Sequence, residues 1–298
     1  MVGRLALLLA VLAAALTACG SAPTTGTPGV LQVVAAESVW GSIAAQVGGP
    51  RVHVTSIISN PATDPHAYEP TAADARAVAS ATLVWYNGVG YDAWMPKLVA
   101  VDPGLTVLDV GRVVGATGGA NPHQWYNPGD VRAAIAAYVS DLARLEPTHA
   151  AYFQARAVAF ETSGLATYNH LIAAIRARYG GTPVGASESI FSMLAPSLGL
   201  DVLTPYSFLR AVSEGTDVSA ADKATIDSQI RHHRIDAYIY NSQNTTPDVQ
   251  AQLAECRSVG IPTATITETL VPVGATYQAW QVAQLRDIEA ALAKGVGR

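Results

Sequence analysis

Short strand-like runs alternate with Ala-rich helical runs in two parts of this chain, and this alternation restricts the fold more than any other feature. In the first part the strand-like runs cover residues 31–38, 51–58, 81–88 and 105–111. In the second part they cover residues 182–189, 198–205, 234–243 and 261–270. Strands that alternate with helices form βαβ units, in which helices cover both faces of a parallel sheet. The sequence therefore predicts an α/β fold with two lobes of βα units and mainly parallel sheets.

The middle of the chain has a helical pattern with few breaks. Pro147 marks a helix start, because proline is tolerated in the first turn of a helix. The segment 147–179 contains no other proline and one internal glycine, so we expect it to be one long connecting helix. This organisation predicts an N-terminal lobe at residues 30–146 and a C-terminal lobe at residues 180–298, which ends in an amphipathic helix at 276–295.

The first residues of the chain have the pattern of a secretory signal. The apolar run at residues 5–16 is too short to span a bilayer and ends in small residues, so we interpret residues 1–18 as a signal peptide. The end of this segment together with the following cysteine, LTAC at residues 16–19, resembles a bacterial lipobox, which implies that Cys19 becomes a lipid-modified N-terminus. The alternative is an ordinary signal peptide followed by an incidental cysteine. Residues 19–29 are rich in Gly, Ser, Pro and Thr and are expected to form a flexible, lipid-anchored tether.

Charge and cysteine content restrict the partners. Charged residues make up 14% of the chain and the net charge is −5, so we expect no basic surface and no nucleic-acid partner. If Cys19 is acylated, Cys256 is the only other thiol, which excludes a disulfide framework. We expect the protein to be a monomer.

Two short segments, DPHAYEP at residues 64–70 and NPHQWYNP at residues 121–128, place a histidine in the same frame of prolines. Proline fixes its own φ and forces the preceding residue into an extended conformation. A histidine held in this way loses little conformational freedom when it binds a ligand. The frames therefore favour His66 and His123 as metal ligands, although an ordinary turn explains either frame alone.

Polar residues at the ends of the predicted strands make a larger candidate site. His66 follows the strand at 51–58, His123 follows the strand at 105–111, and Glu188 and Glu268 end two strand-like runs of the second part. In open α/β sheets, ligands bind beyond the carboxyl ends of the strands. Imidazole and carboxylate together suit Zn²⁺, Mn²⁺ or Fe²⁺. Spacing alone leaves open whether these side chains converge or serve as turn residues and solvated acids.

Five segments, in their order along the chain, resemble the metal-binding lipoproteins that deliver zinc or manganese to bacterial ABC importers, a family of solute-binding proteins. These segments are NPATDPHAYEPTAAD (60–74), WYNGVGYDAW (85–94), NPHQWYNP (121–128), ASESIFSMLAPSLGL (186–200) and ITETLVP (266–272). With the signal region, the resemblance covers essentially the whole chain. It implies two lobes joined by a rigid helix, one metal ion in the crevice between them, an exported protein, and an ABC transporter membrane permease as partner.

The resemblance also assigns a ligand set. By position, His66, His123 and Glu188 correspond to the first three ligands of the family, and Glu268 falls where the fourth is usually an aspartate. The transported ion is expected to be one Zn²⁺ or one Mn²⁺. Many zinc-specific members carry a His-rich loop before the second histidine, whereas this chain has VGATGGA there. The two metals therefore stay open.

Four further residues are expected around the ion. Asp64 is a candidate partner of the His66 imidazole, because such partners orient metal-binding histidines. Tyr68 and Trp125 are expected to form walls of the site, although both could belong to an ordinary core. Asn241 ends a predicted strand and is expected next to the ligands.

Two other functions are weighed against transport. A hydrolytic zinc enzyme keeps an open coordination position and supplies a general base. The sequence has no H-E-x-x-H motif, and four protein ligands would close the site, so we expect no enzymatic activity. The other alternative is a metal-dependent surface adhesin, in which the metal has only a structural role.

Overall fold

The computed structural model of the chain describes residues 29–63 and 65–297. The predicted signal peptide, Cys19 and almost all of the predicted tether lie outside the described residues, and so does Asp64. Among the described helices, none has the length and apolar character that a membrane span requires.

Two four-stranded sheets form the centre of the structure, and every strand pairing in them is parallel. The first sheet has the order β2-β1-β3-β4, with β1 (Leu31–Glu37), β2 (Val52–Ile58), β3 (Leu83–Tyr86) and β4 (Thr106–Asp109). The second has the order β6-β5-β7-β8, with β5 (Pro183–Ala186), β6 (Asp201–Val202), β7 (Ala237–Asn241) and β8 (Thr263–Ile266). The predicted pair of parallel α/β sheets is confirmed.

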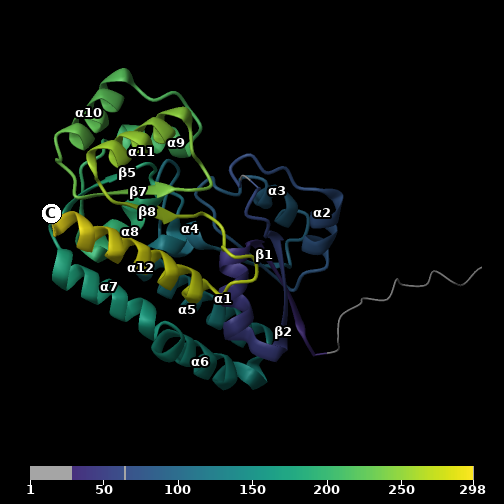
Figure 1. Cartoon of the computed structure of the whole chain (residues 1–298). Helices are drawn as coiled ribbons and strands as arrows, with labels where there is room; N and C mark the ends of the chain where they lie inside the picture. The colour runs from purple at the N-terminus through teal and green to yellow at the C-terminus, as the bar shows by residue number, and fades with distance from the viewer. Residues whose placement is uncertain (1–28, 64, 298) are drawn as a thin grey trace, which may run out of the picture.

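We call the first sheet and its helices the N-terminal lobe, and the second sheet and its helices the C-terminal lobe (Figure 1). The helices of the N-terminal lobe are α1 (Ser38–Gly48), η1 (Gly49–Arg51), α2 (Ala72–Ala79), α3 (Met95–Val99), α4 (Val110–Val113), η2 (Gln124–Tyr126) and α5 (Pro128–Leu145). Those of the C-terminal lobe are α8 (Ile190–Leu198), α9 (Tyr206–Ser213), α10 (Ala220–Arg231), α11 (Pro247–Val259) and α12 (Tyr277–Val296).

The expected connecting helix links the two lobes in the sequence, begins with a 3₁₀ turn and contains a π-helical turn. It consists of η3 (Pro147–His149), α6 (Ala150–Ala159), the π-helical turn η4 (Phe160–Gly164) and α7 (Ala166–Tyr179). At the π turn, Leu165 N–H donates to Phe160 O at 2.8 Å, one residue further back than in an α-helix. Gly164 fits here because an added Cβ would lie 3.2 Å from the Phe160 ring.

The connecting helix and α12 join the lobes along one side of the molecule (Figure 1). α6 contacts α1 of the N-terminal lobe, and α7 contacts α8 and α12 of the C-terminal lobe. The central strands β3 and β7 are almost completely buried, because helices cover both faces of each sheet. This burial explains why these strands read as continuous apolar runs. The crevice between the lobes opens at the carboxyl ends of the strands.

Candidate metal centre

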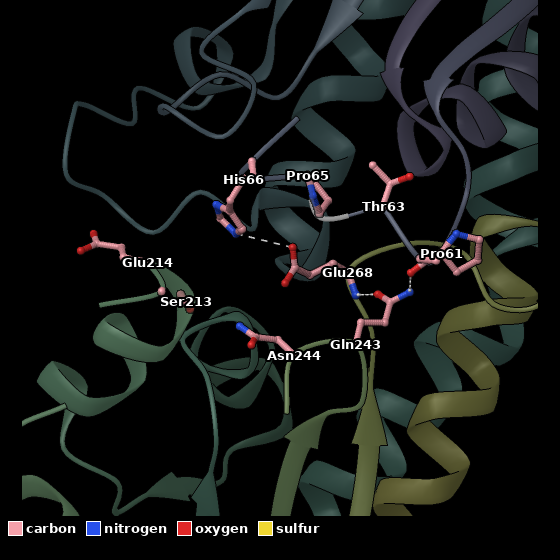
Figure 2. A pocket seen from close by; sticks show the side chains of 12 residues that line it. Pro61, Thr63, Pro65, His66, Ser213, Glu214, Gln243, Asn244 and Glu268 are labelled. Carbon is pink, nitrogen blue, oxygen red and sulfur yellow. Dashed lines mark hydrogen bonds and ion pairs between the residues drawn. The ribbon is translucent and has the colours of Figure 1, made fainter. Parts of the chain in front are cut away.

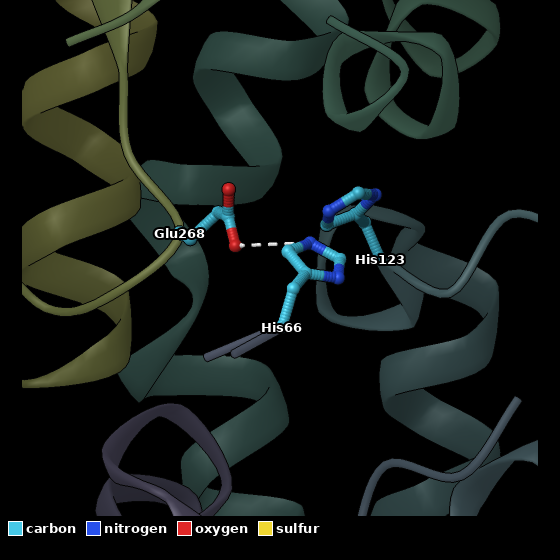
Figure 3. Close-up of side chains that lie close together, drawn as sticks. All are labelled: His66, His123 and Glu268. Carbon is cyan, nitrogen blue, oxygen red and sulfur yellow. Dashed lines mark ion pairs between the residues drawn. The ribbon is translucent and has the colours of Figure 1, made fainter. Parts of the chain in front are cut away.

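Three loops bring His66, His123 and Glu268 together in the crevice (Figure 3). The loops of His66 and Glu268 follow β2 and β8 directly, and the loop of His123 follows β4 and the short helix α4, so the side chains come from the carboxyl-end side of both sheets. One ligand atom from each residue lies within 4.8 Å of the other two. His66 Nε2 lies 3.5 Å from Glu268 Oε2. These three side chains are close enough for one cation to contact all of them.

Glu188 lies beside this group but is not one of its members. Its carboxylate is buried after β5 and accepts hydrogen bonds from the Asn241 amide at 2.5 Å and the Asn244 amide at 2.8 Å. Asn241 Nδ2 also donates to Glu268 Oε1 at 2.9 Å. One amide group therefore joins the two carboxylates, and Glu188 is one hydrogen-bonding partner away from Glu268.

His123 is fully buried and is held as a neutral imidazole. Its Nδ1 lies 2.8 Å from Asn121 Oδ1, and because this amide oxygen only accepts, Nδ1 carries the proton. Its Nε2 has no hydrogen-bond partner among the described residues. Burial, and then the charge of His66, lower the pKa of His123 well below its ordinary value of 6.5. The arrangement leaves a buried nitrogen lone pair, which a metal ion can use.

The backbone before His123 is fixed by a neighbouring loop. Asn87 follows β3, and its side-chain amide donates to Pro122 O at 2.7 Å. After His123 the chain forms η2, and Asn127 then caps α5 by accepting from Gly129 N–H at 2.8 Å. The second histidine frame is thus held at both ends, as the rigid proline pattern requires.

Tyr91 contacts Glu268 from the N-terminal lobe. Its hydroxyl donates to Glu268 Oε2 at 2.9 Å. Burial, followed by the charge of Glu268, raises the pKa of Tyr91 well above 10, so Tyr91 stays a phenol and a donor. Sequence reasoning missed this residue, although Tyr91 lies in the segment WYNGVGYDAW that carried the resemblance.

A buried carboxyl pair holds the loop that carries Tyr91. Asp92 accepts hydrogen bonds from the backbone N–H groups of Asn87 at 2.6 Å and Gly88 at 2.9 Å. Burial, and then the neighbouring Asp92 carboxylate, raise the pKa of Glu37 well above its ordinary value. Burial also raises the pKa of Asp92 to about 6. The raised pKa of Glu37 favours its protonated form, and this form avoids a second buried charge beside Asp92.

Aromatic rings surround the histidines. Trp125 packs edge-on against His123 with ring centroids 5.4 Å apart, and Tyr91 packs against His66 at 4.8 Å. Tyr68 lines a neighbouring hollow together with His66; it packs against Trp94 at 5.3 Å and donates its hydroxyl to Asp74 at 2.7 Å. Of the residues expected around the ion, Trp125 contacts a histidine ring, and Asn241 contacts the carboxylates.

The crevice gives access to the group from one side (Figure 2). It has a volume of about 340 Å³ and is lined from the N-terminal lobe by Pro65 and His66, and from the C-terminal lobe by Gln243, Asn244 and Glu268. His66 is the exposed member of the group, whereas His123 lies at its buried end. A cation entering the crevice meets His66 and Glu268 before it meets His123.

The buried, neutral state of His123 predicts a pH dependence of stability in the metal-free protein. A histidine in the unfolded chain takes up a proton near pH 6.5, whereas folded His123 does so only at lower pH. Below pH 6.5 the unfolded state binds more protons, so the free energy of unfolding falls as the pH falls, by up to about 1.4 kcal/mol per pH unit. Urea unfolding should show that His123→Gln lacks this part of the slope. An identical slope in both proteins would mean that His123 is not buried as a neutral group.

Comparison with known proteins identifies the family. The family model of the periplasmic zinc-uptake complex component A (ZnuA) matches residues 33–291. The manganese-binding lipoprotein MntA of Halalkalibacterium halodurans is 29% identical over 135 residues, which cover 44% of this chain and 45% of that protein. The aligned region is thus less than half the length of this curated relative.

Solved structures share the fold at lower identity. The cadmium-bound periplasmic metal binding protein of Candidatus Liberibacter asiaticus superposes with a TM-score of 0.73 at 20% identity, covering 88% of this chain and 99% of that chain. A mutant of the laminin-binding adhesin Lmb of Streptococcus agalactiae superposes with a TM-score of 0.72 over the same shares, also at 20% identity. Because the family model matches most of the chain, this protein belongs to the family of the periplasmic zinc-uptake complex component A.

Proposed function

We propose that this protein captures one divalent transition metal ion, zinc or manganese, outside the cytoplasm and delivers it to an ABC importer through the membrane permease. The observation that carries this proposal is the convergence of two imidazoles and a carboxylate from opposite lobes. The buried, unpartnered Nε2 of His123 supports it, because a cation would satisfy this atom. Family membership and the manganese-binding relative MntA support a transition metal as the ligand.

We propose His66, His123, Glu188 and Glu268 as the ligands. Two carboxylates offset the charge of a buried dication, and the two neutral imidazoles complete a ligand set that suits zinc and manganese. Asn241 orients both carboxylates through one amide group. When the ion is bound, Glu188 would exchange part of its contact with the Asn241 and Asn244 amides for the metal.

A transport role fits the crevice better than catalysis or adhesion does. Four protein ligands leave no open position for a reacting water, which a hydrolytic zinc site requires. An adhesin, as Lmb is named, would need the metal only for its structure. The crevice that leads to His66 and Glu268 supports reversible entry and exit of the ion. Removing the metal with a chelator should leave the protein folded; unfolding on removal would favour the structural role.

The first prediction concerns the ligands. His66→Ala and His123→Ala should each weaken zinc binding by more than about 100-fold, because changes in residues that only support ligands already cost about 10- to 100-fold. Isothermal titration of the stripped protein measures the affinity and the number of sites. His170→Ala on α7 serves as the matched control and should bind like wild type. If both ligand variants keep one site of unchanged affinity, the assignment is wrong.

The second prediction concerns the choice of metal. Two carboxylates form a harder ligand set than one, which moves relative preference toward Mn²⁺, whereas the Irving–Williams order still favours Zn²⁺ in absolute affinity. Competition titration should therefore show that both ions bind and that zinc binds more tightly. Glu188→His should shift the balance further toward zinc. The hard-ligand argument fails if the wild type takes up no Mn²⁺ at millimolar concentration and Glu188→His leaves zinc affinity unaltered.

The third prediction concerns the anchor. We propose that the protein is exported and anchored to the membrane, on the cell surface or periplasmic side, by lipid on Cys19, since LTAC ends an apolar run and a segment rich in Gly, Ser, Pro and Thr comes next. Cys19→Ala should move the protein from the membrane fraction to the soluble fraction. Intact mass of the mature wild type should show a lipid-modified residue 19 at the N-terminus. A different N-terminus, or an unmodified mass, would contradict the anchor.

A further inference from the structure

A glutamine side chain connects Glu268 to the opposite lobe (Figure 2). Gln243 follows β7, and its Oε1 accepts from the backbone N–H groups of Glu268 at 2.8 Å and Thr269 at 3.1 Å. Its Nε2 donates to Thr269 Oγ1 at 2.6 Å and, across the crevice, to Pro61 O at 3.0 Å. Pro61 lies in the N-terminal-lobe loop that carries His66. One amide thus joins the backbone of Glu268 to the loop of His66.

An asparagine makes the reciprocal connection from the N-terminal lobe. Asn121 Oδ1 accepts the Nδ1 proton of His123 at 2.8 Å. Its Nδ2 donates to Ser189 O at 2.6 Å, and Ser189 is the residue after Glu188 in the C-terminal lobe. One amide therefore joins the imidazole of His123 to the backbone beside Glu188.

The side-chain amides of Gln243 and Asn121 have the same arrangement of hydrogen bonds. Each uses its oxygen to fix a proposed ligand of its own lobe, and each uses its nitrogen to hold a loop of the other lobe next to another proposed ligand. Glu268 is joined to His66 in this way, and His123 is joined to Glu188. The lobes cannot separate at the crevice without breaking both nitrogen-to-carbonyl hydrogen bonds.

We propose that Gln243 and Asn121 are positioning residues that hold the two lobes together around the metal and thereby set how fast it is released. We call their hydrogen bonds to Pro61 O and Ser189 O the clasp. The proposal rests on the proposed metal-binding function. In this role neither residue contacts the ion. Each keeps a ligand from one lobe in reach of a ligand from the other, so loss of a clasp raises the rate of metal dissociation.

Two nearly isosteric variants remove the cross-lobe donors. In Gln243→Glu the contact with Thr269 can persist, because the Thr269 hydroxyl can donate to the new carboxylate. Gln243→Glu keeps an acceptor for the Glu268 and Thr269 N–H groups but cannot donate to Pro61 O. Asn121→Asp keeps the acceptor for His123 Nδ1–H but cannot donate to Ser189 O. Both variants add negative charge near a cation, which by itself would slow dissociation. This attraction acts against faster release, and the uncharged variant Gln243→Met separates loss of the donor from repulsion between a new carboxylate and Pro61 O.

The experiment measures zinc release from the full-length loaded protein into excess chelator, followed by tryptophan fluorescence in a stopped-flow instrument. We expect each variant to release zinc about 3- to 10-fold faster, in line with the loss of one hydrogen bond, and the double variant to show the product of the two effects. The association rate should not fall. A purely structural defect would instead slow association and lower the thermal stability of the metal-free form along with affinity.

Thr269→Val is the matched control, because it removes the hydroxyl that Gln243 contacts within its own lobe and leaves the contact with Pro61 in place. It should release zinc within about twofold of the wild-type rate. If Gln243→Glu folds poorly, Gln243→Met replaces it, since methionine has a similar length, no charge and no donor. A change in Thr269→Val equal to that in the Gln243 variants would overturn the inter-lobe role.

The outcomes also separate this proposal from the one on which it rests. If the wild type takes up no zinc, the proposed function fails. If the wild type binds one equivalent and both amide variants release it at the wild-type rate, the function stands and the clasp is wrong.

Discussion

One constraint governs the site: the carboxylates of Glu188 and Glu268 and the imidazole of His123 are buried together in one crevice. A buried charge is costly unless it is paired and hydrogen-bonded, and two nearby carboxylates also repel each other. The Asn241 amide contacts both Glu188 and Glu268, while Asn244 and Tyr91 donate to one carboxylate each. Neutral donors thus satisfy the oxygens without supplying a permanent positive charge. The positive charge that would balance these carboxylates is therefore left to a bound metal ion.

A second pair of buried acids, Glu37 and Asp92, also limits the number of buried charges. The raised pKa of Glu37 favours its protonated form beside Asp92, and the Asp92 carboxylate organises the backbone at Asn87 and Gly88. That backbone carries Tyr91 toward Glu268, and the Asn87 side chain holds the residue before His123. The orientation of two proposed ligands therefore depends on one buried pair of acids.

Much of the fold could be predicted from the sequence because strand and helix periodicities are local. Each predicted strand is present, and each is shorter than the run that indicated it. The shortest is at 198–205, where only Asp201–Val202 forms a strand. The π turn at Phe160–Gly164 could not be predicted from the pattern, because a π turn has no residue composition of its own and lies between two segments with ordinary helical patterns. The pairing order of the strands also depends on contacts distant in sequence.

At the site, the parallel topology explains why residues at strand ends were good candidates. His66, His123 and Glu268 meet because all three follow strands whose carboxyl ends face the crevice. Sequence reasoning could not supply Tyr91, Asn121 or Gln243, because each acts through a hydrogen bond to a residue far along the chain. One sequence signal did point to Asn121: it stands two residues before His123 in the second histidine frame, as Asp64 stands two residues before His66 in the first.

The proposed nitrogen ligands and oxygen ligands come from different lobes. Both proposed nitrogen ligands, His66 and His123, come from the N-terminal lobe, and both proposed oxygen ligands, Glu188 and Glu268, come from the C-terminal lobe. A carboxylate attracts a cation over the Debye length, about 8 Å at physiological ionic strength, whereas a neutral imidazole acts only at contact. In the proposed site, the C-terminal wall of the crevice would therefore attract the ion from a distance, and the N-terminal wall would select it by its affinity for nitrogen.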